Sequence, residues 1–144
     1  MNDQNDGGIH WSFWVIAAFA LIWNVMGSAN YVMQMNADMV ASLPETHRAI
    51  IIGRPVWATG GFAVGVFVGA LGGLLLLLRK SAALYLFTAS LLGVIVTTIH
   101  TVAVGRSKTA FSTVEILVMI VMPLVVAVLL VWYSRWADSE GWTR

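Results

Sequence analysis

The segment Val56–Lys80, VWATGGFAVGVFVGALGGLLLLLRK, decides the fold of this chain. It carries no charge from Val56 to Leu78, and Arg79 and Lys80 end the apolar run. A helix of about 20 apolar residues crosses the hydrocarbon core of a bilayer, and a helix satisfies its backbone polar groups internally. We therefore expect a transmembrane helix over residues 56–78.

The composition of the whole chain agrees with a membrane protein. Of its 144 residues, 59% are hydrophobic and 10% are charged, whereas soluble domains have about 25% charged residues. The chain therefore lacks the polar groups that would cover a soluble domain. Its net charge of +1 gives no reason to expect a nucleic acid as a partner, and the absence of cysteine excludes disulfides and thiolate metal sites.

Three further apolar runs have the length of a membrane span, at residues 11–32, 82–104 and 112–133. We expect an all-α polytopic membrane protein, in which residues 1–144 form one transmembrane domain, a four-transmembrane-helix bundle in the lipid bilayer. Arg79 and Lys80 form a tight turn and Arg135 adjoins a span. Lys and Arg are divided evenly between the two sides of the membrane, so their count does not set the orientation. From the positions of Arg79, Lys80 and Arg135 next to spans, we place both termini in the cytoplasm.

The first connection, residues 36–55, is the only long one. Ser42-Leu43-Pro44-Glu45 has the pattern of a capping box with proline in the first turn, and Gly53 and Pro55 would end the helix that follows. We expect a short interfacial helix here; an ordinary structured loop is the alternative.

Glycine recurs at every fourth position of the second span, at Gly61, Gly65, Gly69 and Gly73. Small residues on one helix face let a neighbouring backbone approach closely. We interpret this stripe as a packing surface inside the bundle. The alternative is an interface with a partner chain, such as a second copy in a homodimer.

Polar side chains gather at one end of the predicted bundle. Because the spans are antiparallel, the long first loop lies on the same side as the end of the third span and the start of the fourth. Polar residues in a membrane are costly and usually face the bundle interior. We therefore predict a polar pocket open toward the long loop, with Asn24 as its floor. The candidate ligand-binding residues are Asn24, Asn30, Trp57, His100 and Glu115.

Glu115 and His100 lie about one turn inside their spans, at similar depths. One hypothesis is a protonatable pair that binds a polar ligand. The alternative is that Glu115 reaches the membrane surface or bonds Arg106 or Lys108 in its own loop. For Asn24 the alternative to ligand contact is an interhelical hydrogen bond.

The sequence predicts no metal, cofactor or catalytic residue. Met33, Met35 and Met39 lie near His47, and thioethers with imidazole can bind copper(I); methionine is nevertheless an ordinary gap-filling residue, and no repeated metal-binding motif is present. The chain lacks the H-E-x-x-H, G-x-S-x-G and P-loop motifs. We therefore expect that the protein is not an enzyme.

Several stretches resemble a group of small four-helix bacterial inner-membrane proteins, mostly uncharacterised and sometimes labelled sugar transporters. The stretches are Leu21–Gly27 (LIWNVMG), Arg54–Trp57 (RPVW), Gly69–Gly73 (GALGG) and Leu74–Lys80 (LLLLLRK). Ser81-Ala82-Ala83 stands where the resemblance leads us to expect a tryptophan. The resemblance implies a multi-pass protein of the bacterial inner membrane and singles out Trp23, Asn24 and Trp57.

Two functions fit these observations. The protein could bind or transport a small polar solute in the pocket at the long-loop end, as a homodimer packed through the glycine stripe. Alternatively, it could be a non-catalytic accessory subunit of a larger membrane complex, with the glycines docking a partner.

Overall fold

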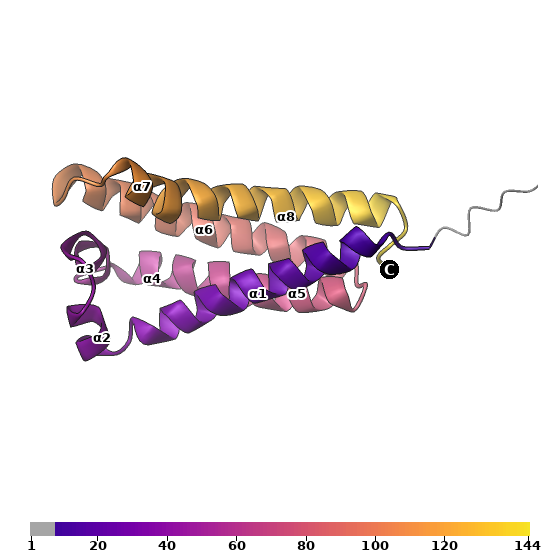
Figure 1. The fold of residues 1–144 in the computed structure, drawn as a ribbon, viewed down its shortest axis with the longest axis horizontal. Coiled ribbons are helices and arrows are strands. Elements are labelled where there is room, and N and C mark those ends of the chain that lie inside the picture. The colour runs from indigo at the N-terminus through magenta and orange to yellow at the C-terminus, as the bar shows by residue number, and fades with distance from the viewer. Residues whose placement is uncertain (1–7) are drawn as a thin grey trace, which may run out of the picture.

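The computed structural model describes residues 8–144 as four antiparallel helical spans (Figure 1). The first span is α1 (Trp11–Met33). The second runs through α4 (Val56–Ala63), the π-helical turn η1 (Val64–Val68) and α5 (Gly69–Leu77), and the third is α6 (Ala82–Ser107). The fourth consists of α7 (Thr113–Ile116), the π-helical turn η2 (Leu117–Val121) and α8 (Met122–Ser139).

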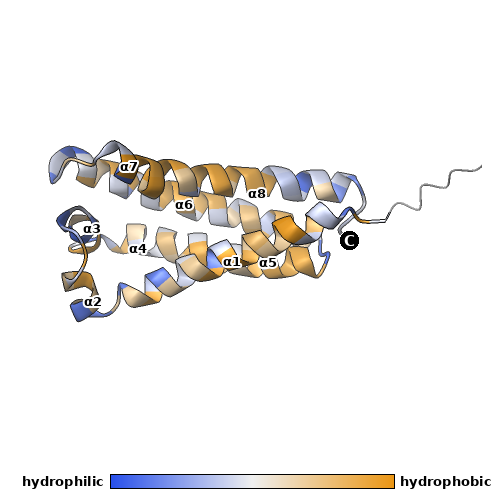
Figure 2. Cartoon of the chain, viewed as in Figure 1, coloured by the Kyte–Doolittle hydropathy of each residue, from blue (hydrophilic) through white to orange (hydrophobic). Residues whose placement is uncertain are grey.

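All four spans are long and apolar enough to cross a membrane, and apolar residues dominate their middle portions (Figure 2). The prediction of an all-α, multi-pass membrane protein is therefore confirmed. The polar stretch Met1–Gly8 that precedes the first span falls almost entirely outside the described residues.

The first two spans end within one residue of the predicted bounds, whereas the last two run longer. The third was expected to end at 104 and the fourth at 133, but α6 continues to Ser107 and α8 to Ser139. Hydropathy marks where the hydrocarbon ends, and a helix with polar residues can continue into the headgroup region.

The glycine stripe packs against two neighbouring helices of the same chain. Four residues turn an α-helix by about 400°, so such a stripe drifts about 40° at each step. A Cβ atom on Gly61 would lie 3.0 Å from the carbonyl oxygen of Gly93 in α6, whereas one on Gly73 would lie 2.7 Å from the Cα of Leu21 in α1. The stripe thus lets both neighbours approach the second span closely.

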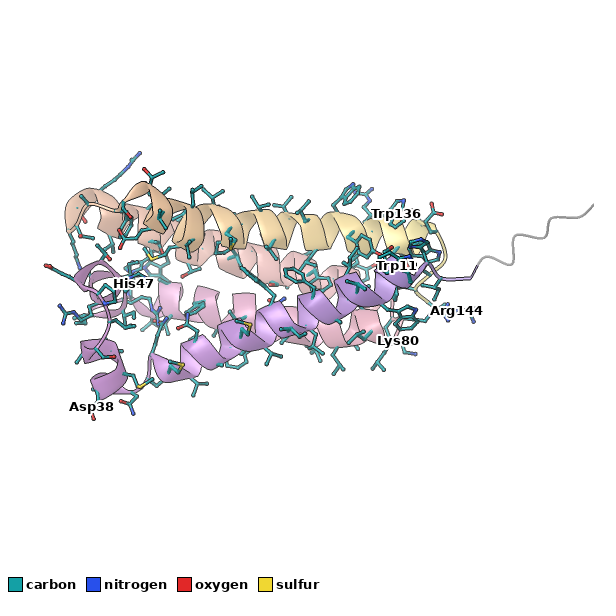
Figure 3. The ribbon with its side chains drawn as sticks, in the orientation of Figure 1. Trp11, Asp38, His47, Lys80, Trp136 and Arg144 are labelled. Carbon is teal, nitrogen blue, oxygen red and sulfur yellow. The ribbon has the colours of Figure 1, made fainter. Side chains whose placement is uncertain are left out.

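An apolar core joins all four spans at the end of the bundle that holds the carboxyl terminus, which we call the terminal end. Phe13, Leu76 and Phe87 are its largest fully buried side chains. Tyr133 of α8 lies next to Phe13, with ring centroids 6.5 Å apart. Trp11, Trp136, Lys80 and Arg144 all lie at this end in Figure 3.

The segment after α8 folds back onto the turn between α5 and α6. The backbone N–H of Arg144 donates to the carbonyl of Arg79 at 2.8 Å, and that of Ser81 donates to the carbonyl of Arg144 at 3.0 Å. The ring of Trp142 packs against Phe13, with centroids 6.0 Å apart. This segment therefore closes the terminal end.

The first connection forms two short helices, α2 (Ala37–Ala41) and α3 (Glu45–Ile51). Gly53 has a φ of +75° and follows α3, as predicted. The predicted capping box is wrong, because Pro44 precedes α3 without a side-chain cap and the Ser42 hydroxyl donates to the Met39 carbonyl. Figure 1 shows α3 across the end of the bundle opposite the carboxyl terminus; we call this the α3 end.

The close approach of α1 to α5 can be tested with glycine substitutions. Gly73→Ala would push a Cβ against the backbone of Leu21, and we expect it to lower the free energy of unfolding by about 1–3 kcal/mol. Nothing lies within 4 Å of a Cβ on Gly60, so Gly60→Ala should be neutral or stabilising by up to about 1 kcal/mol. Denaturant titration in micelles measures both; equal losses would contradict this packing.

The folded-back segment can be tested through Trp142. Its ring packs on Phe13 and on Trp136, and each such pair contributes about 0.5–1.5 kcal/mol. We expect Trp142→Ala to lower the free energy of unfolding by about 1–3 kcal/mol. Trp132, which is 62% exposed, provides the control Trp132→Ala. A thermal midpoint unchanged by Trp142→Ala would show that the segment does not stabilise the bundle.

Candidate functional site

A cavity of about 590 Å³ lies inside the bundle, between α1, the second span, α6 and the fourth span. This volume is in the range of small-molecule sites. Residues of α3 also line it, so α3 forms its cap. The polar residues of the cavity wall are Asn24, Asn30, Gln34, His47, Arg54, Ser90, Thr97, Thr98 and Thr101.

The wall of the cavity changes from polar to apolar along the bundle axis. Asn30, Gln34 and Arg54 lie at the α3 end. The opposite wall contains Phe87 and Leu130, which also belong to the core at the terminal end. The predicted position of a pocket at the long-loop end therefore agrees with the structure. Asn24 lies deep in this cavity, level with Ser90 and Gly69, and the apolar Phe87 and Leu130 lie beyond it.

The cavity opens sideways between α1 and the fourth span. In the rest of the bundle α1 packs on α5 and α8 packs on α6, and Figure 1 shows α1 and α8 diverging toward the α3 end. Met26 of α1 is 66% exposed, and Val118 and Met122 of the fourth span are 52% and 46% exposed. All three also line the cavity, so its lateral opening faces the lipid.

Arg54 carries the fixed positive charge of the cavity wall. Its Nη1 donates to Oε1 of Gln34 at 2.9 Å and its Nε to Oγ1 of Thr59 at 3.2 Å. The guanidinium carbon lies 5.3 Å from the centroid of the Phe62 ring. Burial lowers the pKa of Arg54 from its ordinary value, because desolvation disfavours the charged form, and the smaller effect of Tyr31 raises it.

Asn24 is a buried polar residue of the cavity wall, level with Gly69 and Ser90. It is 6% exposed, and its Nδ2 donates to the carbonyl of Ala20 in its own helix at 2.8 Å. A Cβ on Gly69 would overlap its side chain, so this glycine makes room for the amide. The described hydrogen bond of Asn24 is thus intrahelical and not the interhelical one we considered.

Ser90 stabilises the second span where it departs from α-helical geometry. Its hydroxyl donates to the carbonyl of Gly65 at 2.5 Å. In an α-helix that carbonyl would accept from the N–H of Gly69, which here bonds the carbonyl of Val66. The π-helical turn therefore exposes a backbone acceptor at the cavity wall, and Ser90 satisfies it.

His100 and Glu115 bond α3 and not one another. The Nε2 of His100 donates to the carbonyl of Ile50 at 3.0 Å. The carboxylate of Glu115 accepts from the Thr46 hydroxyl and from the Ser112 backbone N–H in a capping box at the start of α7. The two residues predicted as a pair therefore hold α3 in place from two sides, and neither lines the cavity.

Of the five predicted ligand-binding residues, Asn24 and Asn30 line the cavity and the other three do not. Trp57 is 53% exposed, and its ring lies 6.0 Å from that of His100, outside the cavity wall.

The candidate residues did not include the two ionisable residues of the cavity wall, Arg54 and His47. Arg54 lies just before the second span, and α3 brings His47 over the α3 end of the cavity. Figure 3 shows His47 far from Trp11 and Trp136. Because His47 lies in a loop of the predicted topology, hydropathy gives no information on its depth in the membrane. Its position over the cavity could be known only from the fold of the first connection.

No protein-family model, curated protein or solved structure matches this chain. Within residues 8–144, no three His, Asp or Glu side chains are grouped as a metal site would require.

The attachment of α3 can be tested at Thr46. Thr46→Val keeps the shape of the side chain but removes the hydroxyl that donates to Glu115. We expect amide hydrogens of residues 45–51 to exchange severalfold faster, because α3 opens more often. Thr113 on α7 is exposed, and Thr113→Val is the matched control. Unchanged exchange in Thr46→Val would show that this bond does not hold the cap.

Proposed function

We propose that the protein binds an amphiphilic molecule, which enters the cavity from the surrounding lipid between α1 and the fourth span. The observation that carries this proposal is the lateral opening, where Met26, Val118 and Met122 belong both to the cavity wall and to the exposed surface. A ligand dissolved in the bilayer can reach the cavity through this opening without passing through water.

The wall chemistry favours an amphiphile over the small polar solute that the sequence suggested. Phe87, Val126 and Leu130 at the inner end have no side-chain groups that can bond hydroxyls. A buried polar group without a partner costs about 1–3 kcal/mol. An apolar body at the inner end, with a polar head among Asn30, Gln34 and the residues of α3, matches both parts of the wall.

The closed terminal end favours binding over conduction. The core around Phe13, Phe87 and Tyr133 and the segment docked on the α5–α6 turn fill the bundle beyond the cavity. A solute path across the membrane would have to open this core. The proposed activity is therefore to hold an amphiphile. Because α1 and α6 of the same chain cover the glycine stripe, a second copy packed on this stripe is not needed to build the site.

The proposal predicts that filling the cavity expels the ligand. Ala127 is 8% exposed and lines the cavity, whereas its neighbour Val128 is 51% exposed on the lipid side. We expect Ala127→Phe to weaken amphiphile binding by about tenfold or more, because the new ring occupies the ligand's space. Val128→Phe should leave binding unchanged. Native mass spectrometry of protein released from lipid nanodiscs measures the bound amphiphile.

Two results would contradict the proposal. One is wild-type protein released without any bound amphiphile. The other is a fixed stoichiometry with a larger membrane complex in which Ala127→Phe changes nothing; this would favour the accessory-subunit hypothesis.

A further inference from the structure

We propose that Arg54 recognises an anionic head group, a phosphate or a carboxylate, on the amphiphile that the cavity binds. This inference rests on the proposed function and names the chemical class of its ligand. It is carried by the position of Arg54 in the cavity wall and by the identity of its partners.

The partners of Arg54 leave its charge uncompensated. An arginine side chain has five N–H donors, and the two described bonds go to neutral oxygens of Gln34 and Thr59. Within residues 8–144, the remaining donors have no carboxylate among their partners. Gln34 and Phe62 hold the guanidinium in place, so a ligand would meet a charged group already fixed in position.

The rest of the cavity wall contributes no negative charge. His47 and Arg54 are its two ionisable residues, and neither Asp nor Glu lines it. The nearest candidate for a competing anion on α7, Glu115, is engaged by Thr46 and Ser112. An anion at this end would therefore meet a half-buried guanidinium and no like charge in the wall.

The geometry of the guanidinium suits oxyanions. Its planar array of donors matches the two oxygens of a carboxylate or phosphate, and such charge-assisted bonds are stronger than neutral ones. The position of Arg54 also fits the ligand, because it lies two residues before Val56, the first helical residue of the second span. A head group at Arg54 would place an attached apolar chain toward Phe87 and Leu130.

Lipids that differ only in their head group test this proposal. The probes are phosphatidylglycerol and phosphatidylcholine with identical acyl chains, and inorganic phosphate alone. We expect the wild-type protein to bind phosphatidylglycerol about tenfold more tightly than phosphatidylcholine. Arg54→Gln should abolish this preference. Arg48→Gln should keep it, since Arg48 bonds the Ala41 carbonyl and lies outside the cavity wall.

A second measurement does not depend on the folding of any variant. Phosphatidylglycerol with a photoreactive group on its head should label the wild-type protein near Arg54 and α3. Labelling at the terminal end, around Lys80 and Arg144, would overturn the proposal.

The outcomes separate the two inferences. If the wild-type protein binds both lipids equally and Ala127→Phe loses this binding, the role of Arg54 would be overturned, and the amphiphile site would remain supported. Absence of any bound lipid would overturn the proposed function as well. Inorganic phosphate bound as tightly as phosphatidylglycerol would overturn the amphiphilic ligand in favour of a free anion.

Discussion

The close approach of backbones along the second span is the constraint on which the rest of the structure depends. Gly61 meets Gly93 of α6, and Gly73 meets Leu21 of α1, at distances that leave no room for a side chain. These contacts make the second span the centre of the bundle, with α1 on one side and α6 on the other. The fourth span then packs on α6 alone over most of its length, and the space between it and α1 becomes the cavity.

Sequence reasoning predicted the number of spans and the end at which the cavity lies. The number of spans follows from hydropathy. The end of the cavity follows from the position of the polar residues along each span, because the direction of every span is known once the spans are antiparallel. Sequence reasoning could not predict which side chains share a wall, because that depends on the rotation of each helix. A four-residue glycine repeat drifts around an α-helix, and the π-helical turns at Val64–Val68 and Leu117–Val121 change the rotation again. His100 and Glu115 were predicted to pair because they lie at similar depths. In the structure α3 lies between them, and each residue bonds α3.

The charges of the α3 end are arranged so that the carboxylate and the guanidinium have different roles. The carboxylate of Glu115 accepts a hydrogen bond from Thr46 and takes part in the capping box of α7. Its role is therefore to stabilise the position of α3. Arg54 bonds neutral groups and keeps donors available in the cavity wall. The sequence drew attention to Glu115 because it lies inside a predicted span at the depth of His100. In the structure, the charged residue that lines the cavity is Arg54, which lies just before a span.

The lateral opening between α1 and the fourth span has a mechanical consequence. At the terminal end, the rings of Phe13 in α1 and Tyr133 in α8 lie next to one another. The two spans diverge toward the α3 end (Figure 1). A molecule that widens the gap also enlarges the area that the protein occupies in the plane of the bilayer. The work of this expansion is done against the lateral pressure of the surrounding lipid. For a molecule that widens the gap in this way, occupancy of the cavity and membrane tension would be thermodynamically linked, because tension would favour the state with the larger area.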